Sequence, residues 1–445
     1  MSLSTRLLRP FAHVKAGEGA VALLMFATVF SILCAYYVLK TAREGLILSG
    51  GMLGLRGDEL KIYATGVMAM VFVVIVPAYG ALASRVRRIR LINVSYSIVL
   101  ACLAAFFVLG RAGLPIGLVF YIWLGLINMF LVAQFWSYAN DLYSEEQGKR
   151  LFAIIAIGGA AGAIVGPRLT KLADTFTLML VAAALLAVVL ALFNVVERLA
   201  ANRTPRARAA LADAPIGGAG GFSLVLRDRY LVAIAAMAIV SNLVNSTGEY
   251  VLANVAADHA AEVVTNGDEA ARREVIKAFY GDFFFWVNLV GFLVQAFVVS
   301  RVIKRLGVRG ALFVLPVIAF GTYGAIAAAG GLALVTVAKT AENATDYSLQ
   351  NTVRQALFLP TARDVKYKAK VAIDTFFVRF GDTVSAILVG VGIHQFGLGG
   401  GELAVVNLGL VGVWFAIATV IARGHRRLTD EGVLGRAGLP AGALP

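Results

Sequence analysis

The chain has 445 residues, of which 60% are hydrophobic and only 15% charged, with a mean hydropathy of +0.82 and a net charge of +14. An average soluble domain is about 45–50% apolar and about 25% charged, so a soluble enzyme, a disordered chain and a disulfide scaffold are excluded. The apolar runs are too numerous for a single-span receptor and too continuous for the alternating strands of an outer-membrane barrel.

The apolar runs predict twelve membrane-spanning helices, because a helix needs about 20 apolar residues to cross about 30 Å of hydrocarbon. The first run is too long for a signal-peptide core and has no convincing cleavage site, so it is interpreted as a span. In chain order, the predicted spans are 19–47, 60–83, 91–110, 114–140, 151–170, 176–196, 230–256, 276–299, 309–330, 331–358, 369–396 and 402–422.

The basic residues predict the orientation of these spans. With the N-terminus inside, 27 of the 40 Lys and Arg residues fall in inside segments and 8 in outside loops. Basic residues collect in cytoplasmic loops, so we expect both termini in the cytoplasm and an even number of spans. This distribution also accounts for much of the positive charge without any nucleic-acid partner.

One long Ala-, Arg- and Gly-rich segment, 197–229, divides the chain near its middle and is typical of a flexible linker. Short motifs recur on either side of it: Tyr37-Val-Leu in the first half resembles Tyr250-Val-Leu in the second. The sequence therefore predicts an all-α polytopic membrane protein with twelve transmembrane helices in two pseudo-repeated six-helix halves, the plan of major-facilitator transporters. The predicted parts are an N-terminal half (1–196), a cytoplasmic linker (197–229), a C-terminal half (230–422) and a cytoplasmic tail (423–445).

Charged residues inside spans are candidates for function, because a charge in hydrocarbon is costly unless it faces a cavity or a partner. The first span carries Lys40, Arg43 and Glu44 close to Tyr37, and the i,i+4 spacing of Lys40 and Glu44 allows an ion pair. We expect Lys40 and Arg43 to face a cavity; the alternative is an exposed outer cap on the helix.

The tenth span is the most polar one, and its polar residues follow one another at steps of three and four. Helical periodicity places such residues on one face, which is typical of a cavity lining. Lys339 and Glu342 can also simply neutralise each other, which is the structural alternative. The stripe consists of Lys339, Glu342, Asn343, Asp346, Gln350 and Arg354.

Further polar groups lie on the seventh, eighth and eleventh spans. Arg379 stands between Asp374 and Asp382, so an internal ion pair and the binding of an anionic substrate are both open. If transport is coupled to protons, a carboxylate inside the membrane carries them. The candidate substrate-binding residues are Lys40, Arg43, Tyr37, Asn245, Glu249, Lys339, Glu342, Asn343, Asp346, Gln350 and Arg379, and the candidate proton carriers are Glu249, Asp282, Asp346 and Asp382.

The fifth span has small residues every four positions, which allow close helix packing. This pattern also resembles the glycine–proline motif of major-facilitator antiporters, and loop 80–90 resembles the basic inter-helix motif of that superfamily. The expected gating or structural residues are Gly158, Gly162, Gly166, Pro167, Arg85 and Asp141.

No pattern in the chain predicts a catalytic centre. The two cysteines lie in separate apolar runs, and the four histidines are scattered without metal-ligand spacing. A P-loop and a nucleophile elbow are also missing from the sequence, so we expect no ATP hydrolysis, no metal and no cofactor.

Four segments resemble the nucleotide exchange transporters, the ATP:ADP antiporters of plastids and intracellular bacteria. They are YYVLKTAREGL in the first span, 135–160, 241–252 and 367–386. The resemblance implies a twelve-span major-facilitator-like fold, exchange of purine nucleotides, and a phosphate-binding lysine that corresponds to Lys40. It also implies an acid after the fourth span, at Asp141, Glu145 or Glu146.

The sequence thus predicts a secondary active transporter of the bacterial inner membrane that works by alternating access and exchanges nucleotides, ATP and ADP among them, or related anionic metabolites. The alternative is a proton-coupled major-facilitator exporter of another small organic molecule; a non-transporting scaffold or receptor is a third class. A count of four cations against four acids in the spans also suits a smaller or zwitterionic substrate. The expected partners are this small molecule and the lipid bilayer, with the protein as a monomer.

Overall fold

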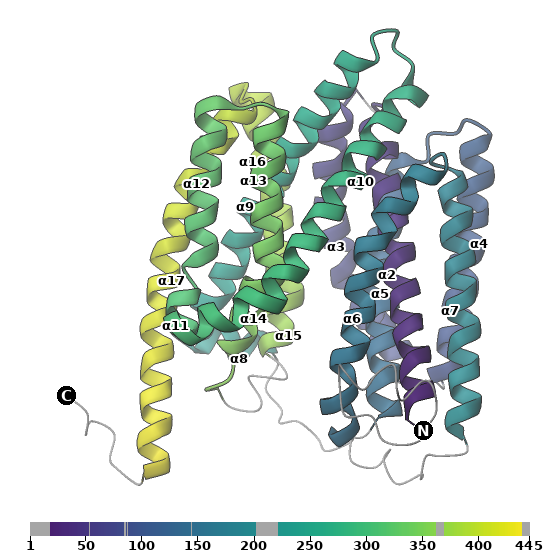
Figure 1. Ribbon diagram of the computed structural model, residues 1–445. Coiled ribbons are helices and arrows are strands. Elements are labelled where there is room, and N and C mark those ends of the chain that lie inside the picture. The colour runs from purple at the N-terminus through teal and green to yellow at the C-terminus, as the bar shows by residue number, and fades with distance from the viewer. Residues whose placement is uncertain are drawn as a thin grey trace. The chain divides into compact units, whose positions relative to one another are not determined.

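The computed structural model describes residues 18–52, 54–83, 86, 88–143, 145–201, 221–361 and 369–437. These residues form helices, with one isolated β-bridge between Met52 and Leu55 (Figure 1). The predicted all-α class is therefore confirmed. The main helices are α2 (Gly19–Leu48), α3 (Gly57–Ala83), α4 (Arg88–Arg111), α5 (Gly117–Leu142), α6 (Glu145–Leu169), α7 (Thr177–Ala201), α9 (Arg229–Val263), α10 (Glu269–Leu293), α11 (Val299–Ala311), α12 (Val314–Ala329), α13 (Leu332–Thr345), α16 (Val378–Phe396) and α17 (Gly400–Ala437).

Shorter elements complete or connect these helices. Turns of 3₁₀ and π type extend α6, α10, α13 and α15 without a loop. The shorter elements are η1 (Thr170–Leu172), α8 (Gly221–Arg227), η3 (Val294–Val298), η4 (Asp346–Gln350), α14 (Asn351–Ala356), α15 (Lys370–Ala372) and η6 (Ile373–Phe377).

Seven helices in the described part of the chain are long and apolar enough to cross a membrane. Their large aliphatic side chains include many that face outward, such as Val74 and Val108, which are 71% and 62% exposed. Such side chains suit lipid better than water, so the chain is a polytopic membrane protein. The seven are Gly19–Leu48, Ile89–Arg111, Gly117–Ala139, Thr177–Leu199, Arg229–Val263, Glu269–Ala311 and Gly400–Asp430.

The helices group into two compact units, each made of several chain segments. The first unit comprises Met1–Ala64, Val71–Asp213 and Ala260–Asn288. The second comprises Thr65–Met70, Ala214–His259 and Leu289–Pro445.

Helix α2 is the centre of the first unit and packs against α5, α6 and α7. Its contact with α6 is close because glycines of α6 face the α2 backbone. A Cβ at Gly158 would lie 2.7 Å from the carbonyl oxygen of Phe26, and one at Gly166 would lie 2.6 Å from that of Cys34. A Cβ at Gly162 would likewise overlap the carbonyl oxygen of Phe30. These glycines therefore act in helix packing, as their four-residue spacing predicts.

The loop before α7 is fixed by Asp174. Its carboxylate accepts hydrogen bonds from the backbone N–H groups of Phe176 (3.0 Å) and Thr177 (3.2 Å), and Arg111 lies 2.9 Å away. Partial burial raises the pKa of the Asp174 carboxyl, but the hydrogen bonds from Thr177 and Phe176 and the charge of Arg111 outweigh it and hold the pKa below its ordinary value. Asp174 therefore caps the start of α7 as a carboxylate.

The second unit is distinguished by three π-helical turns, η3, η4 and η6. Each adds one residue to a turn and is a feature often found at functional sites. Helices α12, α13 and α17 pack together in this unit, and α11 is kinked at Gly307, whose φ of 67° only glycine adopts readily.

Candidate functional site

The first unit holds a group of charged side chains that we call the basic cluster: Lys40, Arg43, Glu44 and Lys61. Lys40, Arg43 and Glu44 lie in the last three turns of α2, and Lys61 lies in the second turn of α3. Arg43, Glu44 and Lys61 are all buried, at 7%, 1% and 7% exposure. Charges buried this deeply need partners, and the cluster supplies them.

Glu44 is held between two cations. Its Oε1 lies 2.8 Å from Arg43 Nη2, and its Oε2 lies 2.9 Å from Lys61 Nζ. Lys61 also donates to the Tyr280 hydroxyl at 3.3 Å. The spacing of Lys40 and Glu44 allows an ion pair within α2, but Glu44 forms its ion pairs with Arg43 and Lys61 instead.

Lys40 points at aromatic rings. Its Nζ lies 4.1 Å from the centroid of Phe284 and 5.3 Å from that of Tyr37, and these two rings pack edge to face. No carboxylate of the described residues lies within ion-pair distance of Lys40. An ammonium on an aromatic face is stabilised by the ring quadrupole while its charge stays unneutralised.

The basic cluster therefore has three cations and one carboxylate, a formal charge of +2. Arg43 is further stabilised by the Tyr121 ring, 4.1 Å from its Cζ. Lys61 is not among the predicted site residues, because it stands at the very start of the predicted span 60–83 and counts with the basic residues of the outside loops. The acids Asp58 and Glu59 in the first turn of α3 start the helix before Lys61, and this was the available signal.

The predicted residue Pro167 lies inside α6 and frees one backbone carbonyl. Proline has no N–H, so the carbonyl of Ala163, four residues earlier, has no helical donor. Asn288 of α10 fills this gap: its Nδ2 donates to the Ala163 oxygen at 3.0 Å and to that of Phe284 at 2.8 Å. The proline is thus accommodated by a side chain from another helix of the first unit.

Asp282, a candidate proton carrier, lies in α10 and pairs with two cations at the end of α6. Arg168 Nη1 lies 2.5 Å and Lys171 Nζ 2.8 Å from its Oδ1. The Asp282 side chain is 46% exposed, so this is a partly solvated ion-pair group.

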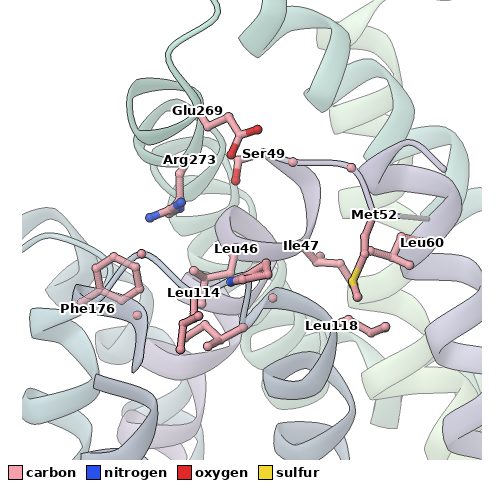
Figure 2. A pocket seen from close by; sticks show the side chains of 17 residues that line it. Leu46, Ile47, Ser49, Met52, Leu60, Leu114, Leu118, Phe176, Glu269 and Arg273 are labelled. Carbon is pink, nitrogen blue, oxygen red and sulfur yellow. The ribbon is translucent and has the colours of Figure 1, made fainter. Parts of the chain in front are cut away.

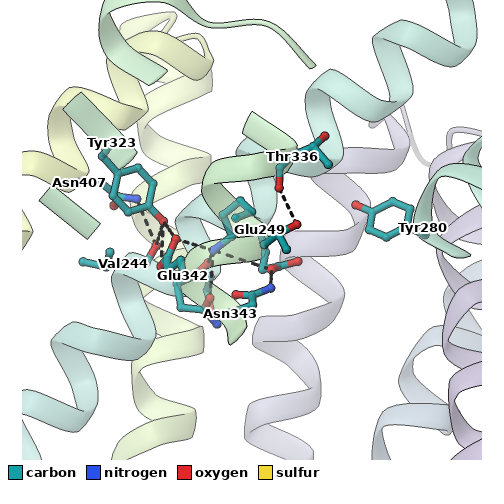
Figure 3. A network of polar contacts seen from close by, with 12 residues as sticks. Val244, Glu249, Tyr280, Tyr323, Thr336, Glu342, Asn343 and Asn407 are labelled. Atoms are coloured by element: carbon teal, nitrogen blue, oxygen red, sulfur yellow. Dashed lines mark hydrogen bonds and ion pairs between the residues drawn. The ribbon is translucent and has the colours of Figure 1, made fainter. Parts of the chain in front are cut away.

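The second unit contains a group that we call the Lys339 cluster: Lys339, Glu342, Glu249, Asn245 and Tyr323. Figure 3 labels Glu342, Glu249 and Tyr323 of this group. Lys339 is fully buried, and its Nζ lies 3.0 Å from Glu342 Oε2, 3.8 Å from Glu249 Oε1 and 3.1 Å from Asn245 Oδ1. The ion pair between Lys339 and Glu342, which was the structural alternative to a cavity lining, is therefore present. With one cation and two carboxylates, the formal charge of this cluster is −1.

Tyr323 of α12 and Asn343 of α13 complete the network. The Tyr323 hydroxyl lies 2.9 Å from Glu342 Oε2, and Asn343 Nδ2 donates to Glu249 Oε1 at 2.8 Å. Gly248 makes room for this arrangement, since a Cβ there would overlap the Tyr323 hydroxyl and lie 3.0 Å from Lys339 Nζ.

The polar stripe of the tenth span is interrupted by the π turn η4. Because this turn adds one residue, the side chains after it are rotated by about 100° relative to those before it. Lys339, Glu342 and Asn343 precede the turn, whereas Arg354 follows it and lies 3.9 Å from Asp374. The predicted stripe therefore contains a π turn, and Asp346 and Gln350 are the first and last residues of that turn.

Asp382 of α16 is fixed by α9. Its Oδ1 accepts hydrogen bonds from Asn242 Nδ2 at 2.6 Å and Ser246 Oγ at 2.7 Å, and Arg379 Nη1 lies 3.2 Å from its Oδ2. Of the two options for Arg379, the internal ion pair is thus present. The Arg379 side chain is still 34% exposed.

Two predicted gating residues lie at the edge of what the structure describes. Asp141 is exposed in the last turn of α5. Arg85 lies outside the described residues, as do the side chains of Glu145 and Glu146.

A cavity of about 180 Å³ lies in the first unit, and none of the predicted site residues lines it (Figure 2). It is lined mainly by glycines and aliphatic side chains of α2, α3 and the turn between α4 and α5. Arg273 and Glu269 of α10 are its charged residues, and the Arg273 guanidinium lies 5.1 Å from the Phe176 ring centroid.

The fold matches those of solved membrane transporters. The structure of the nucleoside transporter NupG superposes with a TM-score of 0.61, over 90% of this chain and 98% of that one, at 12% identity. The peptide transporter POT in complex with sulfate superposes with a TM-score of 0.63, over 95% and 99%, at 16% identity. The chain therefore shares the fold of these solved transporters.

In sequence, the chain is similar to ADP,ATP carrier protein 1 of Chlamydia trachomatis serovar D, with 24% identity over 340 residues. The match covers 66% of this chain and 62% of that relative, so the chain spans less than two thirds of the relative's length. No family model matches the chain. The resemblance to nucleotide exchange transporters is thus confirmed, and these relatives are transporters, not enzymes.

Proposed function

We propose that the protein is a secondary active transporter that exchanges nucleotides or related anionic metabolites across a bacterial inner membrane by alternating access. It has twelve spans in two six-helix halves, 1–196 and 230–422, with the linker 197–229 and the tail 423–445 in the cytoplasm, and it acts as a monomer. The substrate class rests on the similarity to the chlamydial carriers and on the charge of the basic cluster.

The observation that carries this proposal is the surplus positive charge around Lys40. A nucleotide di- or triphosphate brings several negative charges into a site of low dielectric, where each needs a cationic partner. Glu44 neutralises part of the charge of Arg43 and Lys61, and Lys40 has aromatic neighbours but no acidic partner in the described part of the chain. Lys40 is therefore the proposed phosphate-binding residue, and Arg43 and Tyr37 are its proposed neighbours in binding.

Polar groups of the second unit are also proposed to bind substrate. Asn343 Oδ1 and Gln350 Oε1 are buried acceptors with no hydrogen-bond partner among the described residues. Unsatisfied acceptors are rare inside proteins, and a ligand donor such as an amino or hydroxyl group would satisfy them. The other proposed residues of this unit are Asn245, Glu249, Lys339, Glu342, Asp346 and Arg379.

The test is counter-exchange in proteoliposomes loaded with ADP and supplied with labelled ATP outside. Lys40→Gln should reduce apparent ATP affinity roughly 10- to 100-fold, since a hydrogen bond to a charged group is worth about 1.5–3 kcal/mol. Arg111→Gln, which removes an exposed positive charge, is the matched control and should exchange like the wild type.

Binding is measured separately by thermal stabilisation in detergent. A ligand at 100 times its Kd stabilises a protein by about 2.7 kcal/mol, so ATP and ADP should raise the unfolding temperature of the wild type and much less that of Lys40→Gln. A chain that neither binds nor exchanges nucleotides, but is stabilised by another small molecule, would contradict the proposed substrate class.

A further inference from the structure

The Tyr323 hydroxyl lies near more hydrogen-bond acceptors than its single hydrogen can donate to. It lies 2.9 Å from Glu342 Oε2, 3.2 Å from Glu342 Oε1 and 3.1 Å from the backbone oxygen of Val244 (Figure 3). A tyrosine hydroxyl carries one hydrogen and two acceptor lone pairs. It can therefore donate to Glu342 or to Val244, but not to both at once.

Each of these two donations fits one protonation state of Glu342. With Glu342 ionised, Tyr323 donates to the carboxylate, and Asn407 Nδ2 of α17, 3.1 Å away, donates to the Val244 oxygen. With Glu342 protonated, the carboxyl O–H donates to the Tyr323 oxygen, and Tyr323 turns its hydrogen to Val244. In both states the Tyr323 hydroxyl, the Glu342 carboxyl and the Val244 oxygen each keep a hydrogen-bond partner, so the change of charge does not add the usual cost of an unpaired polar group among these three.

The surrounding charges also tolerate both states. Lys339, on the same helix, is the nearest cation, Glu249 faces it from α9, and Asp346 stands one turn further along the helix. The groups that α12 and α17 present here, Tyr323 and Asn407, are uncharged. Protonation of Glu342 changes the formal charge of the Lys339 cluster from −1 to 0 and leaves Glu249 as the counter-ion of Lys339.

From this geometry we propose that Glu342 is a proton-binding site of the transporter, with Tyr323 as the positioning residue whose hydroxyl reorients when the proton binds. One O–H bond forms at a Glu342 carboxylate oxygen with a proton taken from water, and no electron is transferred. This site goes beyond nucleotide exchange, because it gives the protein a second ligand, the proton.

Infrared difference spectroscopy of the purified, lipid-reconstituted full-length protein tests this directly. Between alkaline and acidic buffer, the wild type should gain the carbonyl stretching band of a protonated carboxyl group. Glu342→Gln should lose the component that comes from a buried carboxyl. Glu402→Gln, which removes an exposed carboxylate at the start of α17, is the matched control and should keep that component.

Tyr323→Phe separates the positioning role from a role in folding. The hydroxyl that this variant loses donates to the charged Glu342 carboxylate in the ionised state and to the neutral Val244 oxygen in the protonated state. A hydrogen bond to a charged group is about twice as strong as one to a neutral group, so the loss weakens the ionised state more. The buried band should therefore persist in Tyr323→Phe, with its titration midpoint raised by roughly one pH unit.

Two results would overturn the inference: a buried band unchanged in Glu342→Gln, or one that is lost in Glu249→Gln and kept in Glu342→Gln. If Glu342→Gln does not fold, an unshifted midpoint in Tyr323→Phe would equally refute it. The spectra need no substrate, so their outcome is independent of whether the protein exchanges nucleotides.

Discussion

Replacement of Glu44 by glutamine should be among the most damaging single changes in the first unit. Glu44 is 1% exposed and is the carboxylate for both Arg43 and Lys61, whose side chains are each 9% exposed. Glutamine keeps the size of the side chain but removes its charge, so two buried cations lose the carboxylate that they share. Breaking a buried ion pair by removing one partner typically costs about 3–5 kcal/mol.

The same geometry predicts that a second change relieves part of this loss. Lys61→Met removes one of the two buried cations that pair with Glu44, so Glu44→Gln/Lys61→Met should be less destabilised than the sum of the single variants by about 0.5–3 kcal/mol. Unfolding in mixed detergent micelles, followed by tryptophan fluorescence, measures all three. Glu262→Gln, which removes an exposed carboxylate, should stay within about 0.5 kcal/mol of the wild type. Additive effects, or a Glu44→Gln variant as stable as the wild type, would refute this account of the basic cluster.

Two further predictions follow from the first unit. Asn288→Ala should lower the free energy of unfolding by about 1–3 kcal/mol, because it leaves the Ala163 carbonyl without a donor. The loss should be smaller in a Pro167→Ala background, where the new N–H restores the helical hydrogen bond. Equal losses in both backgrounds would contradict the proposed role of Asn288. The lowered pKa of Asp174 stabilises the folded state above the ordinary pKa of the carboxyl, so the unfolding temperature should fall as the pH drops below that value towards the folded pKa. Asp174→Asn should remove this part of the acid sensitivity, and a pH profile identical to the wild type would exclude it.

The sequence predicted the helices well because their signal is local. The first apolar run predicted a span over 19–47, and α2 extends from Gly19 to Leu48. The partners of the charged side chains were harder to predict, because they depend on which helices pack together. The i,i+4 rule suggested Lys40 for Glu44, whereas the structure brings in Lys61 from the next helix.

The interruption of the tenth span was equally invisible to the sequence. Steps of three and four fit an unbroken α-helix, and no proline or glycine marks the break between Asp346 and Gln350. By contrast, Lys339 and Glu342 lie within one regular stretch of α13, and the ion pair that their spacing allowed is found at 3.0 Å.

The π turn η4 makes the helix sensitive to its own length. An α-helix advances about 100° per residue, so loss of one residue within this turn would rotate Arg354 by that angle relative to Lys339 and aim it away from Asp374. All other side chains would be retained, yet different groups would meet. Insertion and deletion can therefore reorganise the interior of this helix in a way that no series of single substitutions reproduces.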